Sequence, residues 1–561
     1  MSGTLALAAS IAAMSRAELL LLVSSRRVLS PATVHDALGL ALDLLRPESL
    51  NRALSGVDRA SLVALRAVGG GDGSLVDPHV LERLRLQGLL GLDEPVDTAV
   101  PLPEVTEALE TALGGEMLIA SCPSGSPETS DTTRWFGQAL TAVRRATALL
   151  RALATQRARL SRKGAVTAAS ARALADAIHS DPESTAQLLG VLQLAGLAAA
   201  VESGRPSASA TVLVPSAPAR QWLDEPYPAR WIALAGAFAA GLEPQLRQAL
   251  DLAAGDLGHA SRAVLHHEFP LLPSSTIDAA IEWAAVAEVL GLTVHGHLSP
   301  AAIPLLAGDP EAALAVANRD LPPPAEGVYL QPDLTLIVPG PLLPADEHAL
   351  SEFTEAEQLG AAAVLRLTPS SLARAVRLGR SPEDIRALLE RLSLTGIPQP
   401  LDFMLTDLNR PREGAEPTRS PGASWLSRSA SSAAGGSVAG SGLGGAAADP
   451  PPNTNRATSA TRITPATRGE TADSEALVDR VHRAAQSQSQ SGAGDLARRL
   501  ELAIRDRSPI VVTAAAGGVE RTFTLMPVSL TGGRLRATDQ QAGVERTLPV
   551  SAITAVAPAS A

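Results

Sequence analysis

The amino-acid sequence predicts a multidomain α+β protein with a mainly helical, winged-helix-like N-terminal half, a small α/β domain and a C-terminal SH3-like β-barrel. Three observations support this fold class. A chain of 561 residues is too long for one hydrophobic core and suggests about three to five domains. Apolar residues recur at helical spacing through residues 16–320, whereas strand-like runs follow Val328 and Ile510. A stretch rich in Gly, Ser and Pro separates these last two regions.

The first helical segments predict two modules of the winged-helix type, over residues 16–120 and 134–215. In the first module, Ser30 precedes a proline, which is typical of a helix N-cap followed by proline at the first helical position. In the second module, a long helix is followed by helices that begin near Thr167 and Asp181, and then by a strand. Helix, turn, helix and strand in this order are typical of a winged helix-turn-helix.

A further helical region is predicted over residues 218–320, where three tryptophans are expected to anchor the core: Trp222, Trp231 and Trp283. Residues 325–410 predict a small α/β domain, because two strand-like runs precede two helices with proline and serine at their starts.

The C-terminal part begins with a predicted linker over residues 411–472, which is too rich in Gly, Ser, Ala and Pro to form a packed core. Residues 473–561 then predict two helices and five short strands with Gly-Gly turns. This pattern favours a small SH3-like barrel.

Composition places the protein in a reducing compartment. Its one cysteine, Cys122, excludes an internal disulfide, and the first fifteen residues lack the positive charge of a secretory signal. Residues 184–201 are uncharged, but Gln187 and Gln193 within them favour a core helix over a membrane span. We therefore expect a cytoplasmic protein with no membrane partner.

The motifs of an ATP-driven motor are not found in the sequence. The only lysine, Lys163, follows no Gly-rich phosphate loop, and the segment from Asp346 to Ala349 lies after a proline-broken strand. Asp346 and Glu347 are expected to begin a solvated helix, where acidic residues favour the positive end of the dipole. We therefore expect no enzymatic activity, no catalytic residue and no cofactor.

The histidines do not predict a metal site. The segments His266-His267-Glu268 and His295-Gly296-His297 lack the spacing of a helical zinc motif, and no cysteine lies nearby to complete a closed site.

The strongest charge asymmetry lies between Thr141 and Ala175, which contain eight basic residues and no acidic one, in a chain of net charge −11. Guanidinium groups suit phosphate because their donors form a planar fork. Two alternatives remain open, namely a solvated helix end and an acidic protein partner. The predicted DNA-binding residues of this stretch are Arg144, Arg145, Arg151, Arg157, Arg159, Arg162 and Lys163.

A second basic group, Arg374, Arg377 and Arg380, adds to the predicted DNA-binding residues. Arg374 and Arg377 fall on one helical face. The alternative of ordinary salt bridges remains open here, because Glu383 and Asp384 are close in sequence. A third group, which includes Arg498, Arg499, Arg505 and Arg507, alternates with acids and favours a solvated face.

Residues 328–410 resemble the N-terminal accessory domain of XPB-type DNA helicases. The likeness rests on three details, namely the break at Pro339-Gly340 after the strand, the helix start Arg366-Leu-Thr-Pro-Ser-Ser-Leu372, and Ile397-Pro-Gln-Pro-Leu401 before the last helix. In those helicases the domain lies outside the ATPase lobes and is implicated in contacting DNA, including distorted DNA. The whole pattern resembles bacterial helicase-associated proteins that lack the motor.

The C-terminal strands resemble the WYL domain, an SH3-like module that senses ligands or nucleic acids. The matching stretch begins at Met526, but Gly533-Arg534-Leu535-Arg536 stands where Trp-Tyr-Leu is found in that family.

These observations predict a DNA-binding, helicase-associated accessory protein. It is expected to hold duplex or distorted DNA through its Arg-rich winged-helix and XPB-like domains, and to work with a helicase or a transcription or repair protein. Two alternatives stay open at this point. One is a protein-interaction scaffold that docks on such an enzyme, and the other is a WYL-like ligand-sensing regulator.

Overall fold

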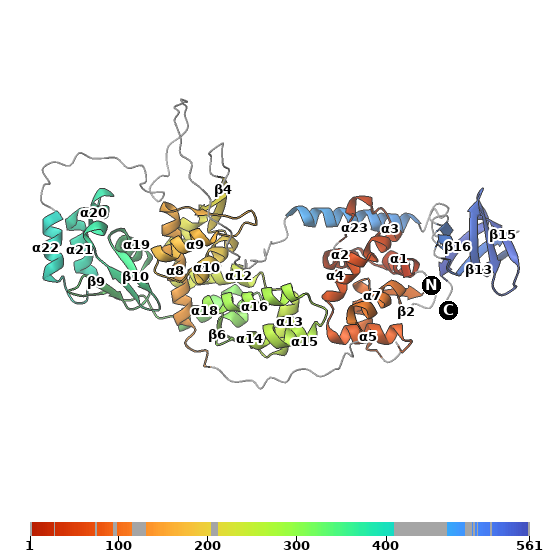
Figure 1. The fold of residues 1–561 in the computed structure, drawn as a ribbon, viewed down its shortest axis with the longest axis horizontal. Coiled ribbons are helices and arrows are strands. Elements are labelled where there is room, and N and C mark those ends of the chain that lie inside the picture. Colours follow the sequence, from red (N-terminus) through yellow and green to blue (C-terminus); the bar gives the residue numbers. More distant parts are fainter. Residues whose placement is uncertain are drawn as a thin grey trace, which may run out of the picture. The chain divides into compact units, whose positions relative to one another are not determined.

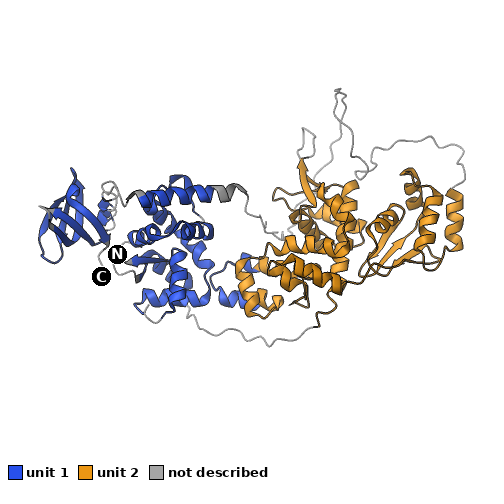
Figure 2. Ribbon diagram, turned by 180° about the vertical axis from the view of Figure 1, so that it is seen from behind, with its two compact units in different colours: residues 1–124, 263–277, 464–561 blue, residues 125–262, 278–463 orange. Residues whose placement is uncertain are grey.

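The computed structural model describes residues 3–26, 28–72, 76–93, 98–114, 131–202, 211–408, 468–488, 496, 500–501, 503–505, 507–516 and 519–558. The chain forms two compact units (Figure 2), which comprise residues 1–124, 263–277 and 464–561, and residues 125–262 and 278–463. Helices and several small sheets occur together, so the predicted α+β class is confirmed. No described helix has the length and apolarity needed to cross a membrane.

The N-terminal helices of the first unit surround one hydrophobic core. Side-chain caps start several of them, with Ser15, Asp36 and Asp58 each accepting a backbone N–H of the first turn. The elements are α1 (Gly3–Ala13), α2 (Arg16–Ser25), η1 (Pro31–Thr33), α3 (Ala37–Leu44), α4 (Pro47–Ser55), α5 (Arg59–Gly69), α6 (Pro78–Leu86), the hairpin β1 (Leu90–Asp93) and β2 (Thr98–Pro101), and α7 (Pro103–Leu113).

Helix α23 (Arg468–Gln488) completes this core from far along the sequence and lies beside α2 and α3 (Figure 1). Leu477, Val478 and Val481 are buried in the same cluster as the N-terminal leucines. An ion pair of 2.8 Å between Arg16 Nε and Asp479 Oδ1 lies over this contact. The sequence places this helix next to the C-terminal strands and does not predict its packing.

The C-terminal strands form an open antiparallel sheet in the order β15-β14-β13-β12-β16. The five predicted strands are present, but no closed barrel is found among the described residues, so the predicted barrel is not borne out. The sheet is open because its two edge strands do not pair with each other among the described residues. Strand β15 pairs with β14, and strand β16 pairs with β12. The strands are β12 (Ile510–Ala516), β13 (Val519–Thr531), β14 (Arg534–Asp539), β15 (Glu545–Pro549) and, after η4 (Val550–Ala552), β16 (Ile553–Pro558).

Several expectations fall on parts of the chain that lie outside the described residues. They concern Cys122, most of the linker, Arg498 and Arg499.

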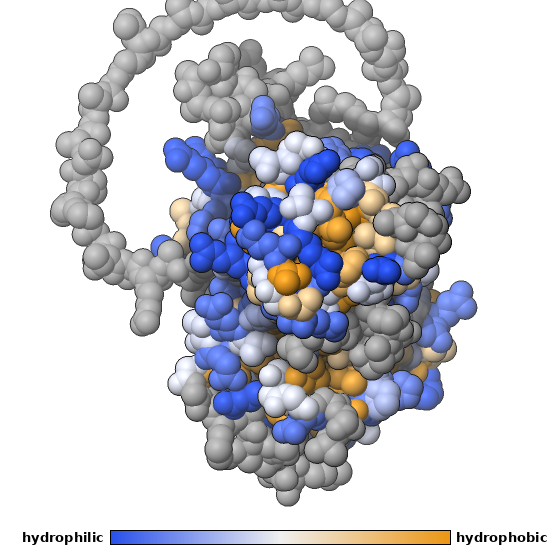
Figure 3. Space-filling view, turned by 90° about the vertical axis from the view of Figure 1, so that its right-hand side faces the viewer, coloured by the Kyte–Doolittle hydropathy of each residue, from blue (hydrophilic) through white to orange (hydrophobic). Residues whose placement is uncertain are grey.

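Figure 3 shows a face of the molecule on which hydrophilic side chains gather, with apolar side chains scattered among them.

The second unit begins with three helices and a three-stranded antiparallel sheet in the order β3-β5-β4. Thr167 caps α9, and Asp181 caps α10 ahead of a proline, as the sequence predicts. The elements are α8 (Phe136–Thr155), β3 (Ala158–Arg159), α9 (Ala168–Ala177), α10 (Pro182–Leu194), β4 (Ala198–Glu202) and β5 (Thr211–Pro215).

The following helical region confirms the predicted tryptophan anchors. Trp231 is completely buried, and Trp222 and Trp283 are only 5% and 6% exposed. The elements are α11 (Pro218–Asp224), α12 (Tyr227–Ala239), α13 (Pro244–Leu252), α14 (Leu257–His259), η3 (Ala260–Val264), α15 (Leu265–Glu268), α16 (Ser274–Val289), β6 (Thr293–Val294), β7 (His297–Leu298), α17 (Ala302–Leu306) and α18 (Pro310–Asp320).

Residues 328–408 fold into a four-stranded antiparallel sheet in the order β10-β11-β9-β8 with four helices (Figure 1). The predicted strands and helices are present. Strand β10 is an addition, because its sequence Glu-Ala-Glu-Gln-Leu carries no β-branched or aromatic residue. The elements are β8 (Tyr329–Leu330), β9 (Thr335–Val338), α19 (Pro344–Phe353), β10 (Glu355–Leu359), β11 (Ala363–Arg366), α20 (Pro369–Arg377), α21 (Pro382–Leu392) and α22 (Gln399–Leu408).

Replacing Leu477 by alanine should destabilise the first unit although the residue follows the long predicted linker. The Leu477 side chain is 1% exposed, so its removal leaves a cavity that costs roughly 2–5 kcal/mol of unfolding free energy. Urea unfolding followed by circular dichroism measures this change. Leu21→Ala is the matched control, because Leu21 of α2 is 60% exposed. Equal effects of the two substitutions would contradict the packing of α23.

Candidate nucleic-acid interface

Strand β3 presents two arginines to solvent. Ala158 is 1% exposed and pairs with Leu213 of β5, so it holds the strand against the core. Because side chains alternate along a strand, Arg157 and Arg159 on either side of Ala158 share the opposite face. Both arginines are exposed.

A tight turn after β3 adds two more cations. Ser161 donates its backbone N–H to the Ala165 carbonyl at 2.8 Å, and Gly164 donates to the Ser161 carbonyl at 2.9 Å. Gly164 has a φ of 80°, a conformation that glycine adopts without steric cost. The turn leaves Arg162 and Lys163 exposed. Arg157, Arg159, Arg162 and Lys163 are called the β3 cluster below.

The members of the β3 cluster make no ion pair within the described part of the chain, in contrast to several other arginines of the second unit. Elsewhere in this unit Arg319 pairs with Asp320, Arg366 with Glu357 and Arg391 with Asp346. The first turn of α9 closes the cluster, since Thr167 donates its N–H to the Arg159 carbonyl at 2.9 Å. Four cations within seven residues are therefore free to meet an external anion.

Arg144 does not belong to this surface, and its predicted contact with DNA is wrong. Its side chain is only 4% exposed. Its Nη1 donates to the carbonyls of Gly360 and Ala361 at 2.8 and 2.6 Å, and its Nη2 donates to the Gly340 carbonyl at 2.5 Å. The guanidinium thus joins α8 to loops of the 328–408 domain and is not available to phosphate.

Arg145 and Arg151 are partly buried. Burial acts to raise the pKa of Asp181, but hydrogen bonds from Ser184 and the charge of Arg145 outweigh it and lower the pKa. Burial lowers the pKa of Arg151, against the attraction of Glu347. Neither side chain is as exposed as those of the β3 cluster.

Asp346 and Glu347 do not begin a solvated helix, so that expectation is corrected. Asp346 is 9% exposed and accepts hydrogen bonds from Arg391. Glu347 accepts a bond of 2.7 Å from Nη1 of Arg230, whose side chain is completely buried, and one of 2.9 Å from the hydroxyl of Tyr227. These acids join α19 to neighbouring helices because a buried guanidinium needs a counter-charge.

The pKa of Glu347 reflects this pairing. Burial alone raises the pKa of this carboxyl. The charges of Arg230 and Arg151, with hydrogen bonds from Arg230 and Tyr227, outweigh burial and hold the pKa below its usual range. The carboxylate is therefore ionised at neutral pH. The sequence did not predict the contacts of Glu347 with Arg230 and Tyr227. The signal that it does carry is the recurrence of Arg144, Thr147 and Arg151 at the spacing of one helix face.

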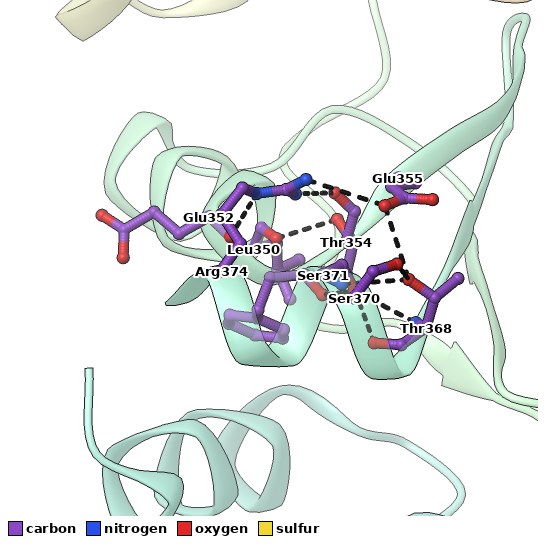
Figure 4. Close-up of polar contacts among 9 residues, drawn as sticks. Leu350, Glu352, Thr354, Glu355, Thr368, Ser370, Ser371 and Arg374 are labelled. Carbon is purple, nitrogen blue, oxygen red and sulfur yellow. Dashed lines mark hydrogen bonds and ion pairs between the residues drawn. The ribbon is translucent and has the colours of Figure 1, made fainter. Parts of the chain in front are cut away.

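The second predicted basic group is divided by the structure. Figure 4 shows Arg374 of α20 reaching the junction of α19 and β10, where its Nη2 donates to the Thr354 carbonyl at 3.1 Å and its Nη1 lies 3.6 Å from Glu355. Arg380 pairs with Glu352 at 2.5 Å. Arg377 is exposed and makes no ion pair with any described residue. The salt-bridge alternative therefore holds for Arg374 and Arg380.

The start of α20 is closed by its own side chains (Figure 4). Thr368 and Ser371 form a capping box, in which each side chain accepts the backbone N–H of the other residue. Glu355 lies 3.4 Å from the Thr368 hydroxyl. A carboxylate thus already occupies the positive end of this helix. No group of three metal-ligating side chains occurs within the described ranges.

Residues 328–419 match the protein family described as helicase conserved C-terminal domain. No curated protein matches the chain. The matched region links the chain to helicase-type proteins and indicates a helicase-related nucleic-acid function.

This match overturns one expectation from the sequence. The lack of a Gly-rich phosphate loop and the proline-broken strand before Asp346 predicted a protein without enzymatic activity. Helicase-family proteins are typically enzymes. The match therefore contradicts the prediction that the protein has no enzymatic activity.

Replacing Arg144 by methionine should destabilise the second unit. Three buried carbonyls then lose their donor, which costs roughly 2–4 kcal/mol of unfolding free energy. Thermal unfolding of the full chain measures the effect. Arg172→Met is the matched control, because Arg172 is exposed on the neighbouring helix α9. An unchanged melting temperature for Arg144→Met would refute its structural role.

Replacing Glu347 by glutamine should destabilise the protein by roughly 3 kcal/mol at neutral pH, because Arg230 stays buried without a counter-charge. The pKa of Glu347 is lowered in the folded state, so its contribution is complete above the unfolded pKa of about 4.3 and is lost as pH falls below it. The difference in unfolding free energy between wild type and E347Q should therefore shrink from pH 6 to pH 3. A constant difference across this range would argue against the ion pair.

Proposed function

We propose that the protein is a helicase-related DNA-binding protein that holds the phosphate backbone through the β3 cluster. The observation that carries this proposal is the presence of four exposed cations that have no carboxylate partner among the described residues, in a chain of net charge −11. Arginine matches phosphate because its planar fork donates two parallel hydrogen bonds. Neutralising each phosphate releases counterions, which supplies most of the affinity at low salt.

The order of elements around the cluster supports a winged helix-turn-helix. Helix α8, strand β3, helices α9 and α10, and the hairpin of β4 and β5 follow one another as in that motif. The sheet order β3-β5-β4 places the first strand beside the last. The β3 cluster then lies on the first strand and on the turn into the second helix.

The charge of the neighbouring regions supports binding at one place. Residues 218–320 contain twelve acidic side chains and five arginines, and residues 328–408 contain eleven and six. These regions repel phosphate, so the β3 cluster is the part of the second unit to which a polyanion is drawn. A local basic surface thus accounts for DNA binding by an acidic chain.

The 328–408 domain supports a helicase-related setting for this binding. Its match to the helicase conserved C-terminal domain and its resemblance to the accessory domain of XPB-type helicases favour a role at DNA that a helicase acts on. Arg377 is the one residue of the second predicted group that is exposed and free of ion pairs within the described residues. We propose it as a secondary phosphate contact.

A protein-docking role is the second candidate function. Phe403 of α22 is 68% exposed and Leu394 before that helix is 49% exposed, on the same acidic domain. Exposed apolar side chains of this size occur at protein interfaces. The ligand-sensing alternative stays a prediction of the sequence.

Replacing Arg157 and Arg159 together by glutamine should weaken binding to a DNA duplex. Loss of two phosphate contacts should reduce the slope of log affinity against log salt by about 1.8. Fluorescence anisotropy with a labelled duplex at several salt concentrations measures both quantities.

The matched control is Arg319→Gln, which removes an arginine that is 69% exposed but already paired with Asp320. It should leave duplex affinity unchanged. Unchanged affinity and salt slope in the double variant would reject the β3 cluster. Absence of any duplex binding by the wild-type chain at low salt would reject the proposed function.

A further inference from the structure

We infer that the β3 cluster holds intact duplex DNA by its backbone alone, without reading base sequence and without stacking unpaired bases. This inference rests on the proposed function and concerns the kind of nucleic acid that the site accepts. It follows from what lies around the cluster in the second unit.

Helix α10 occupies the position of the recognition helix in a helix-turn-helix. Such helices enter the major groove with their N-terminal residues, and cations flanking them contact phosphate. The N-terminal end of α10 presents Asp181 and Glu183 instead, and both are exposed. No arginine or lysine occurs anywhere in α10. A groove lined by phosphates therefore repels this end of the helix.

Two glutamines of α10, Gln187 and Gln193, are able in principle to read adenine, but both are partly buried and lie beyond the first turn of the helix.

Proteins that hold single strands stack successive bases on exposed aromatic rings. Within residues 131–202 and 211–215 the aromatic residues are Trp135, which is completely buried, and Phe136. The exposed aromatic side chains of the described chain are Tyr329 and Phe403, both in the acidic 328–408 domain. The β3 cluster thus has cations without a stacking partner.

The described part of the hairpin after α10 offers no groove-reading cation either. Strand β4 ends in Ala200, Val201 and Glu202, which are exposed, and strand β5 has the sequence Thr-Val-Leu-Val-Pro. Minor-groove readers insert arginine or lysine. Phosphate contact is therefore the chemistry that the described residues of this module provide.

The test compares wild-type binding to unrelated duplexes of equal length, to the same duplex with a central bubble, and to its single strand. We expect affinities for the duplexes to agree within about threefold, whereas sequence-specific proteins discriminate by about a thousandfold or more. With four phosphate contacts from the β3 cluster and a fifth from Arg377, the slope of log affinity against log salt should be about −4.5 on every duplex. The bubble should give no gain, and the single strand should bind more weakly.

Two variants separate the possible outcomes. Gln187→Ala should leave duplex affinity unchanged, and Phe403→Ala should leave affinity for all three substrates unchanged. A tenfold loss with Gln187→Ala, a tenfold preference for one duplex, or single-strand binding that Phe403→Ala abolishes would overturn the inference while duplex binding itself persists. Failure to bind any of these nucleic acids would overturn the proposed function and this inference together.

Discussion

A guanidinium that leaves water must find acceptors, and this constraint organises much of the second unit. Arg230 is completely buried and meets Glu347, whereas Arg144 is satisfied by three carbonyls of the 328–408 domain. These contacts fasten α8 and α12 to the domain that carries the helicase-family match. In contrast, the arginines of the β3 cluster are exposed to water and have no carboxylate partner among the described residues. Arginine thus stabilises the packing of α8 and α12 against the 328–408 domain, whereas in the β3 cluster its charge is exposed.

The sequence predicted the order of the elements well where local signals were strong. Thr167 and Asp181 mark helix starts as predicted. The long helix predicted to reach about Arg159 ends at Thr155 instead, and the sequence did not predict strand β3. It could not separate Arg144 from Arg157, because α8 is buried on most of its faces and its apolar period leaves no clear solvent side. Contacts across long sequence separations were also invisible, such as α23 in the N-terminal core and Glu347 beside Arg230. The open C-terminal sheet depended on which edge strands pair, which propensity does not determine.

The helicase-related setting and the proposed contact with DNA rest on different parts of the second unit. The helicase-related setting rests on the family match of residues 328–419. The proposed contact with DNA rests on the charge of the β3 cluster, because the described part of residues 131–215 provides neither an exposed Trp, Tyr or Phe ring nor a basic recognition helix. A site of this kind brings affinity without sequence selectivity.

The most direct measurement uses Lys163, which belongs to the β3 cluster and is the only lysine of the chain. Acetylation of lysine amines is followed by mass spectrometry with and without saturating duplex DNA at low salt. If the cluster grips phosphate, the duplex should slow acetylation of Lys163 by about tenfold, and high salt should remove this protection. Equal rates of acetylation in the presence and absence of bound duplex would contradict the account.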